Sequence, residues 1–296
     1  MKKISIIILI ILIALPLLAF TDYQSNFSLV DYRSDWSLSW ENYFKKDQKI
    51  GLALGGGSVL GAAHIGVLRA LEELDIEIDL IAGTSIGALI AGLYANGVSW
   101  QEIETMTEDL RWFDLSAPTL SRLGLLSNRR MGDLIREKIG NVNLEDSKIP
   151  VAMIAADIES LKKVILTKGE VAKASMASTC VPGIFSPVEI DNRLLVDGGV
   201  VESVPVSPLL DMGAEIIIAV NLNSENKSEK PKSLIQVLLR TFSLSSNVAT
   251  KFQLSDVDIL IAPDLSEFNV VDIDQSPDLI QKGYEEAIKV LKEYFR

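Results

Sequence analysis

Short apolar runs alternate along the chain with longer stretches in which apolar residues recur every three or four positions. The first pattern is typical of buried strands and the second of helices with one buried face. Strands are predicted over residues 49–54, 79–83, 151–155, 163–167, 193–196, 214–221 and 257–262. Helices are predicted over residues 62–74, 86–96, 100–110, 130–139, 171–179, 232–252 and 278–295.

This alternation favours an α/β fold with a mostly parallel, buried central sheet. Two stretches lack either pattern. Residues 118–128 and the polar residues 223–232 are predicted to be loops. The Leu-rich stretch 114–128 has two interpretations, a lid at a lipid entrance or an ordinary surface loop.

The N-terminus predicts a targeting segment. Lys2 and Lys3 precede an apolar run over residues 4–20, the arrangement of a secretory signal. The run is also close to the length that spans a bilayer, so a cleaved signal peptide and an uncleaved anchor over residues 1–20 both stay open. Because basic residues remain in the cytoplasm, the rest of the chain is expected outside it, in the periplasm or cell envelope. Residues 21–47 are interpreted as a tether and residues 48–296 as the functional domain.

Composition excludes several classes of protein. The chain has 296 residues, with 28 Lys and Arg against 40 Asp and Glu, a net charge of −12. This balance argues against nucleic-acid binding, which needs a basic surface. The single Cys excludes a disulfide framework and a cysteine-based zinc cluster, and the single His excludes a multi-histidine metal site.

The turn Gly83-Thr84-Ser85-Ile86-Gly87 lies between a predicted strand and a predicted helix. A G-x-S-x-G sequence in this position is typical of a nucleophile elbow, which lifts a serine hydroxyl clear of the sheet. The simpler alternative is a tight turn in which Ser85 caps the following helix. The strand–turn–helix context favours Ser85 as a nucleophile.

A second glycine-rich turn, Gly55-Gly56-Gly57-Ser58, also follows a strand. Consecutive glycines allow backbone N–H groups to face an anion. A P-loop would need a lysine before the serine, and a dinucleotide fingerprint would need glycine where Leu60 stands. An oxyanion hole formed by Gly55, Gly56 and Gly57 fits better, since acyl hydrolases take one donor from a separate loop.

The candidate base is an aspartate. A Ser-His-Asp triad of the α/β-hydrolase type runs in the order serine, acid, histidine, but His64 precedes Ser85. Asp197, in the turn Asp197-Gly198-Gly199 at a strand end, is the best alternative base, with an ordinary Asx turn as its simpler interpretation. His64 is the rival base, or else a hydrogen-bonded core residue.

Taken together, these segments resemble the patatin-like phospholipase family. The motifs that carry the resemblance are Gly55–Gly61, Ala63–Leu68, Gly83–Gly87, Lys173–Phe185 and Asp197–Gly199. The resemblance implies a three-layer α/β/α sandwich with a mostly parallel central sheet. It implies hydrolysis of lipid esters at a membrane surface by a Ser85–Asp197 dyad, an oxyanion loop at Gly55, Gly56 and Gly57, and neither metal nor cofactor.

The sequence departs from the family at two positions. The family usually carries Arg or Lys where this chain has Leu60, and often Gly where it has Ser58. Leu60 leaves open a weakly active lipid-binding or scaffold protein of the same fold. The turn Gly55–Ser58 leaves open a nucleotide-binding α/β protein. Head group, acyl chain and oligomeric state are left open by the sequence.

Overall fold

The computed structural model describes residues 48–109, 116–223, 230–231, 233–270 and 272–295. The signal or anchor and the tether predicted over residues 1–47 lie outside these ranges and stay predictions. None of the helices within the ranges combines the length and the apolar composition that a membrane crossing needs.

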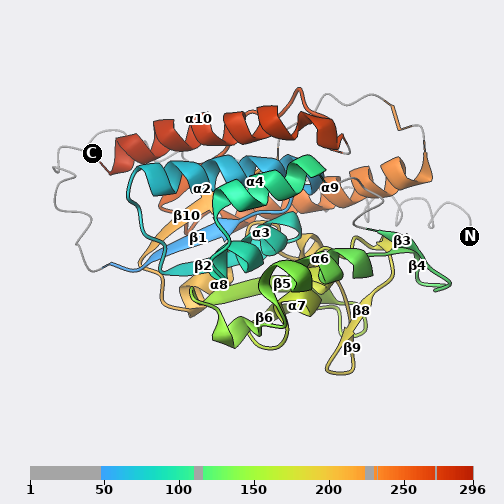
Figure 1. Ribbon diagram of the computed structural model, residues 1–296. Helices are drawn as coiled ribbons and strands as arrows, with labels where there is room; N and C mark the ends of the chain where they lie inside the picture. The colour runs from blue at the N-terminus through green and yellow to red at the C-terminus, as the bar shows by residue number, and fades with distance from the viewer. Residues whose placement is uncertain (1–47, 110–115, 224–229, 232, 271, 296) are drawn as a thin grey trace, which may run out of the picture. The chain divides into compact units, whose positions relative to one another are not determined.

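A sheet of eight strands runs through the centre of the described part of the chain (Figure 1). Five strands pair in parallel in the order β11–β10–β1–β2–β5. They are β1 (Ile50–Leu54), β2 (Leu80–Thr84), β5 (Val151–Asp157), β10 (Ile216–Val220) and β11 (Ile259–Ile261). Beyond β5 the pairing is antiparallel, through β6 (Lys162–Leu166), β9 (Arg193–Asp197) and β8 (Val188–Ile190).

Helices cover both faces of this sheet. Ala152 belongs to a buried row that packs against Leu209 of α8, whereas its neighbour Met153 lies against Gly92 of α3. Because adjacent residues of a strand point to opposite faces, α3 and α8 lie on opposite sides. The helices are α2 (Ala63–Glu73), α3 (Ile86–Ala95), α4 (Trp100–Asp109), α6 (Arg129–Ile139), α7 (Val171–Ser178), α8 (Val206–Asp211), α9 (Leu234–Gln253) and α10 (Ser276–Tyr294).

The last helix closes the fold by lying directly on α2 (Figure 1). Two glycines make this contact possible at backbone distance. A methyl group on Gly66 would lie 1.9 Å from the Ile280 carbonyl oxygen, and one on Gly283 would lie 2.0 Å from that of Ala63. The contact secures α2, which follows the Gly55–Gly57 loop through a 3₁₀ turn, Ser58–Ala62.

The predicted α/β fold and its principal strands and helices are confirmed. The loop predicted over residues 118–128 is wrong in part. The described residues there contain β3 (Ala117–Pro118) and β4 (Gly124–Ser127), which form a second, three-stranded sheet with β7 (Gly183–Phe185). Strands this short carry too few residues for a period of two to be seen in the sequence.

Candidate active site

Ser85 lies at a sharp turn between β2 and α3. Its φ of 56° and ψ of −125° are rarely adopted by a residue with a side chain. The turn depends on glycines on both sides of it. A methyl group on Gly83 would lie 2.4 Å from Ala88 Cα, and one on Gly87 would lie 2.1 Å from the Leu54 carbonyl oxygen. A larger residue at position 83 would push the end of β2 away from the start of α3, and one at position 87 would push α3 away from β1.

Strand β5 brings Ser85 and Asp197 together. Along one edge β5 pairs with β6; along the other it pairs first with β2 and then with β9. Thr84 of β2 stands opposite Ile154, and Asp197 of β9 stands opposite the next residue, Ala155. Because β9 is antiparallel to β5 and β2 is parallel to it, the carboxyl ends of β2 and β9 meet.

The two side chains are hydrogen-bonded at this meeting point. Ser85 Oγ donates to Asp197 Oδ2 at 2.6 Å, and the Gly199 N–H donates to Asp197 Oδ1 at 2.8 Å. Asp197 is fully buried, and Ser85 is 8% exposed. Burial raises the pKa of the Asp197 carboxyl to about 7, although the hydrogen bonds from Ser85 and Gly199 act in the opposite direction. A carboxyl group with this pKa changes its protonation state near neutral pH.

A second serine, not singled out from the sequence, holds the backbone of the elbow. The Ser85 N–H donates to Ser178 Oγ at 2.9 Å, and Ser178 Oγ donates to the Ile154 carbonyl at 2.6 Å. Ser178 ends α7 and is fully buried. A polar residue on the buried face of a predicted helix was the available signal in the sequence.

We predict that Ser178→Ala slows reactions of the Ser85 hydroxyl about tenfold and destabilises the fold by about 1–3 kcal/mol, because two buried backbone groups lose their partner. Ser175→Ala is the matched control, since Ser175 lies on the same helix and its hydroxyl contacts Met153 Sδ at 3.6 Å instead. Steady-state kinetics and thermal unfolding of both variants check the prediction. Equal effects of the two substitutions would contradict it.

The glycine-rich loop lies beside the serine. A methyl group on Gly56 would lie 3.4 Å from Ser85 Cβ. The Gly55 N–H donates to the Val220 carbonyl at 3.1 Å, and the Gly56 N–H donates to the Ser203 carbonyl at 2.9 Å. Within the described residues, no backbone hydrogen bond takes up the N–H of Gly57. Of the three glycines predicted to form an oxyanion hole, Gly57 is therefore the one whose backbone N–H can donate a hydrogen bond to a ligand.

A family model described as patatin-like phospholipase matches residues 52–210, more than half of the chain. The match contains the elbow, the glycine-rich loop and Asp197. The chain belongs to the patatin-like phospholipase family.

Relatives from distant organisms match part of the chain. An uncharacterised NTE family protein of Mycobacterium bovis is 37% identical over 180 residues, which cover 59% of this chain and 49% of that protein. The neuropathy target esterase sws of Drosophila melanogaster is 34% identical over 194 residues, which cover 61% of this chain and 13% of that protein. The chain thus matches about half the length of its mycobacterial relative.

Among solved structures, VipD from Legionella pneumophila superposes with a TM-score of 0.48 and 12% sequence identity. The superposition covers 83% of this chain and 67% of VipD.

His64 lies behind the loop of this patatin-like site. It is fully buried, and its Nε2 is 2.8 Å from the Gly55 carbonyl oxygen. Burial lowers the pKa of the imidazole to about 4, against the effect of that hydrogen bond. Among the described residues, no hydrogen bond joins His64 to Ser85 or Asp197. Nε2 therefore carries the proton and donates a hydrogen bond to the Gly55 carbonyl oxygen. This hydrogen bond holds the glycine-rich loop in place, and the ring does not take part in proton transfer with Ser85.

Leu60 marks the departure from the usual patatin-like pattern. Its side chain is 3% exposed, and it follows the loop in the 3₁₀ turn Ser58–Ala62. Where the family usually presents a cation, this chain packs an apolar side chain. The positive potential beside the loop is then left to backbone N–H groups and to the N-terminus of α3.

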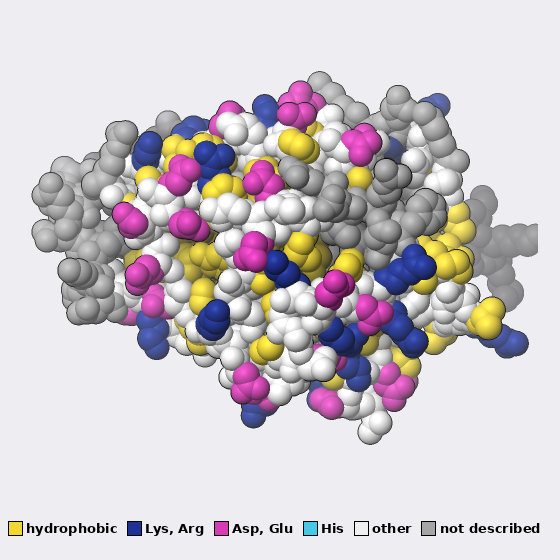
Figure 2. Space-filling model, in the orientation of Figure 1, with side chains coloured by type: hydrophobic (Ala, Val, Ile, Leu, Met, Phe, Trp, Pro, Cys, Tyr) yellow, Lys and Arg dark blue, Asp and Glu magenta, His cyan; other side chains and the backbone are white. Residues whose placement is uncertain are grey.

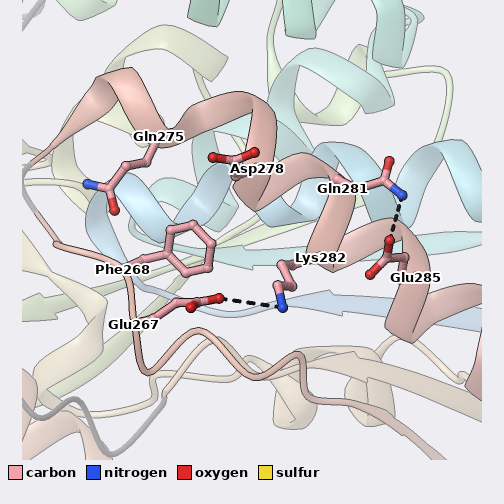
Figure 3. Close-up of a pocket in the computed structure, with 7 residues that line it drawn as sticks. All are labelled: Glu267, Phe268, Gln275, Asp278, Gln281, Lys282 and Glu285. Atoms are coloured by element: carbon pink, nitrogen blue, oxygen red, sulfur yellow. Dashed lines mark hydrogen bonds and ion pairs between the residues drawn. The ribbon is translucent and has the colours of Figure 1, made fainter.

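A separate hollow of about 550 Å³ lies at α10 and the segment before it (Figure 3). Its walls include the ion pair Lys282–Glu267 and a hydrogen bond from Gln281 to Glu285. Neither Ser85 nor Asp197 lines it. No group of His, Cys, Asp and Glu in the described ranges has the arrangement of a metal site.

Proposed function

We propose that this protein hydrolyses carboxylic esters of lipids, with Ser85 as nucleophile and Asp197 as general base. The observation that carries the proposal is the 2.6 Å hydrogen bond from Ser85 Oγ to Asp197 Oδ2 at the tip of a nucleophile elbow. Membership of the patatin-like phospholipase family supports a lipid ester as the substrate. A fatty-acyl ester of a glycerophospholipid is the substrate class we propose.

Acylation begins when Asp197 accepts the hydroxyl proton of Ser85. The Ser85 oxygen forms a bond to the carbonyl carbon of the ester, and the carbonyl π electrons move to its oxygen. The resulting oxyanion is stabilised by the free N–H of Gly57 and by that of Ile86 in the first turn of α3. When the tetrahedral intermediate collapses, the alcohol leaves with the proton from Asp197, and the acyl group stays on Ser85.

Deacylation repeats these steps with water. Asp197 accepts a proton from the water molecule as its oxygen bonds to the acyl carbon. Collapse of the second tetrahedral intermediate releases the fatty acid and returns the proton to Ser85. A single carboxyl group serves as acid and base in both halves, which requires a pKa close to the working pH. Burial of Asp197, which raises its pKa to about 7, supports this role.

Labelling with a fluorophosphonate probe tests the proposal, because the probe reacts covalently with activated serines. We predict that the full chain is labelled on Ser85, as read by peptide mass spectrometry, and that it releases fatty acid from phospholipid. Ser85→Ala is expected to lose both properties, and Ser175→Ala to keep them.

The alternatives have different outcomes in the same experiment. A folded wild-type chain that is neither labelled nor active on lipid esters would favour a lipid-binding or scaffold protein. Stabilisation of the fold by a nucleotide, without labelling, would favour a nucleotide-binding protein at the Gly55–Gly57 loop. Either result would overturn the hydrolase proposal.

A further inference from the structure

Large apolar side chains are exposed in two neighbouring segments. The first is the β3–β4 hairpin, in which Leu123 is 59% exposed. The second is the beginning of α9, in which Leu234 is 65% exposed. Scattered exposed leucines are ordinary, but several together mark an interaction site. We call these residues the docking surface: Leu120, Leu123, Leu125, Leu234, Ile235 and Val237.

The two segments are joined through β7. Leu126 of β4 pairs with Phe185 of β7, and both belong to an apolar cluster that also contains Leu238 and Leu239 of α9. Leu126 points inward to this cluster, so the alternate residues Leu123 and Leu125 point outward. Figure 1 places β3, β4 and α9 at the same end of the sheet, and Figure 2 shows hydrophobic and basic side chains grouped where Figure 1 places β3 and β4.

The charge of these segments is opposite to that of the chain. Residues 116–132 contain Arg122, Arg129 and Arg130 and no acidic residue, and residues 233–255 contain Arg240 and Lys251 and no acidic residue. The whole chain has 40 acidic against 28 basic residues. No ion pair found among the described residues involves Arg122, Arg129 or Arg240. Exposed leucines beside arginines fit an apolar layer covered by negative head groups.

We propose that the docking surface binds an anionic phospholipid bilayer, with its leucines below the head groups and its arginines among them. This inference rests on the proposed function, since it specifies where the lipid substrate meets the protein. A second copy of the chain fits the surface poorly, because a two-fold interface would bring the same arginines face to face.

Helix α9 connects the docking surface with the active site. Leu234 and Phe242 are eight residues apart, or about 12 Å along a helix. The ring of Phe242 lies against the Asp197 turn, since a methyl group on Gly199 would lie 2.7 Å from Phe242 Cζ. At the other end of α9, Gln253 accepts the N–H of Ser203, whose carbonyl holds Gly56. A bilayer on this surface therefore lies about 12 Å along α9 from the residue that packs on the Asp197 turn, and the same helix reaches the partner of Gly56 at its far end.

A polarity-sensitive dye on single cysteines tests the proposal in the full chain. Cys180 is the only cysteine and is fully buried, so an introduced cysteine is labelled selectively. We place the dye at Leu123→Cys or Leu234→Cys. Both variants also carry Ser85→Ala, so that the protein does not hydrolyse the phospholipids of the vesicles during the measurement. Leu161→Cys is the control, because Leu161 is 86% exposed but lies in the turn between β5 and β6. The dye reports its own position, so membrane binding through another segment does not produce the signal.

With vesicles of phosphatidylcholine and phosphatidylglycerol, we expect a blue shift several-fold larger at positions 123 and 234 than at 161. Combining Arg122→Glu with Arg129→Glu is expected to lower the apparent affinity for these vesicles by roughly 30-fold or more. Equal shifts at positions 123 and 161, or no dependence on phosphatidylglycerol, would overturn the proposal. A blue shift that rises with protein concentration in the absence of vesicles would assign the surface to a second copy instead.

Hydrolysis assays separate this inference from the proposed function. With Ser85 intact, Leu123→Ser combined with Leu234→Ser is expected to lower hydrolysis of vesicle phospholipid more than tenfold. Hydrolysis of a soluble short-chain ester is expected to change less than twofold. Loss of both activities would contradict the docking role, whereas a wild-type chain inactive on both substrates would contradict the hydrolase proposal alone. The fluorescence result stands in either case.

Discussion

Replacing Asp197 with asparagine is expected to lower ester hydrolysis by about 10³-fold, because a positioned general base contributes roughly 10²- to 10⁴-fold to a reaction rate. The amide group is close in shape to the carboxyl group, so the geometry of the site is kept. Its oxygen can accept the Gly199 N–H, and its NH₂ group can donate to Ser85 Oγ. The substitution thus removes the proton acceptor while leaving hydrogen bonds in place.

The same substitution is expected to stabilise the folded protein at neutral pH. Burial raises the pKa of Asp197 from 3.8 to about 7. The folded chain therefore binds more protons than the unfolded chain between about pH 4 and 7, and the stability linked to this group is lost as the pH rises through that window. Asparagine carries no charge. The variant therefore avoids a loss of up to about 4 kcal/mol in the free energy of unfolding that ionisation of the buried carboxyl group causes in the wild type.

Thermal unfolding of wild type and Asp197→Asn from pH 4 to 8 measures this effect. The gain in melting temperature is expected to be largest at pH 7 and above and to vanish near pH 4. A variant that is both inactive and stabilised at neutral pH supports a buried carboxylate retained for catalysis. More than a tenth of wild-type activity in Asp197→Asn, or a gain in stability independent of pH, would contradict this account.

The second large effect is the pH dependence of the wild-type rate. A base must be ionised to accept the Ser85 proton, and the Asp197 carboxyl is protonated below its pKa of about 7. We therefore expect kcat/KM for a soluble ester to be constant above pH 7 and to fall tenfold for each pH unit below it, or about 100-fold at pH 5. Circular dichroism at each pH separates this fall from unfolding. A rate that is constant between pH 5 and 7 would contradict the role of Asp197.

The sequence was sufficient for the parts of the site that follow from local pattern. A strand followed by glycines and a helix, at Gly83–Gly87 and Gly55–Gly57, predicts where a serine and a set of N–H groups stand because parallel strands end at one edge of the sheet. The single histidine precedes Ser85 in the chain, and this order favours a carboxylate as the base. These inferences need no knowledge of how distant strands pair.

What the sequence could not supply depends on long-range pairing. Nothing in the pattern of β9 indicates that it runs antiparallel to β5 and shares an edge of it with β2, although this register brings Asp197 to Ser85. Partners such as Ser203, which occupies the N–H of Gly56, lie about 150 residues from the loop they hold. The β3–β4 part of the docking surface falls in the predicted loop 118–128, because its strands are too short to show a period of two in the sequence.

The identity of the base is the central claim, and the pH dependence of fluorophosphonate labelling in three proteins tests it most directly. Burial reverses the usual order of the two pKa values, since it raises the pKa of the Asp197 carboxyl to about 7 and lowers that of the His64 imidazole to about 4. We predict that the rate of labelling of Ser85 in wild type and in His64→Gln rises with pH through an ionisation near pH 7. In Asp197→Asn, labelling is expected to be very slow, and its rate is expected to show no such ionisation. Rapid labelling of Asp197→Asn, together with loss of the ionisation in His64→Gln, would assign the base to His64 and contradict the account.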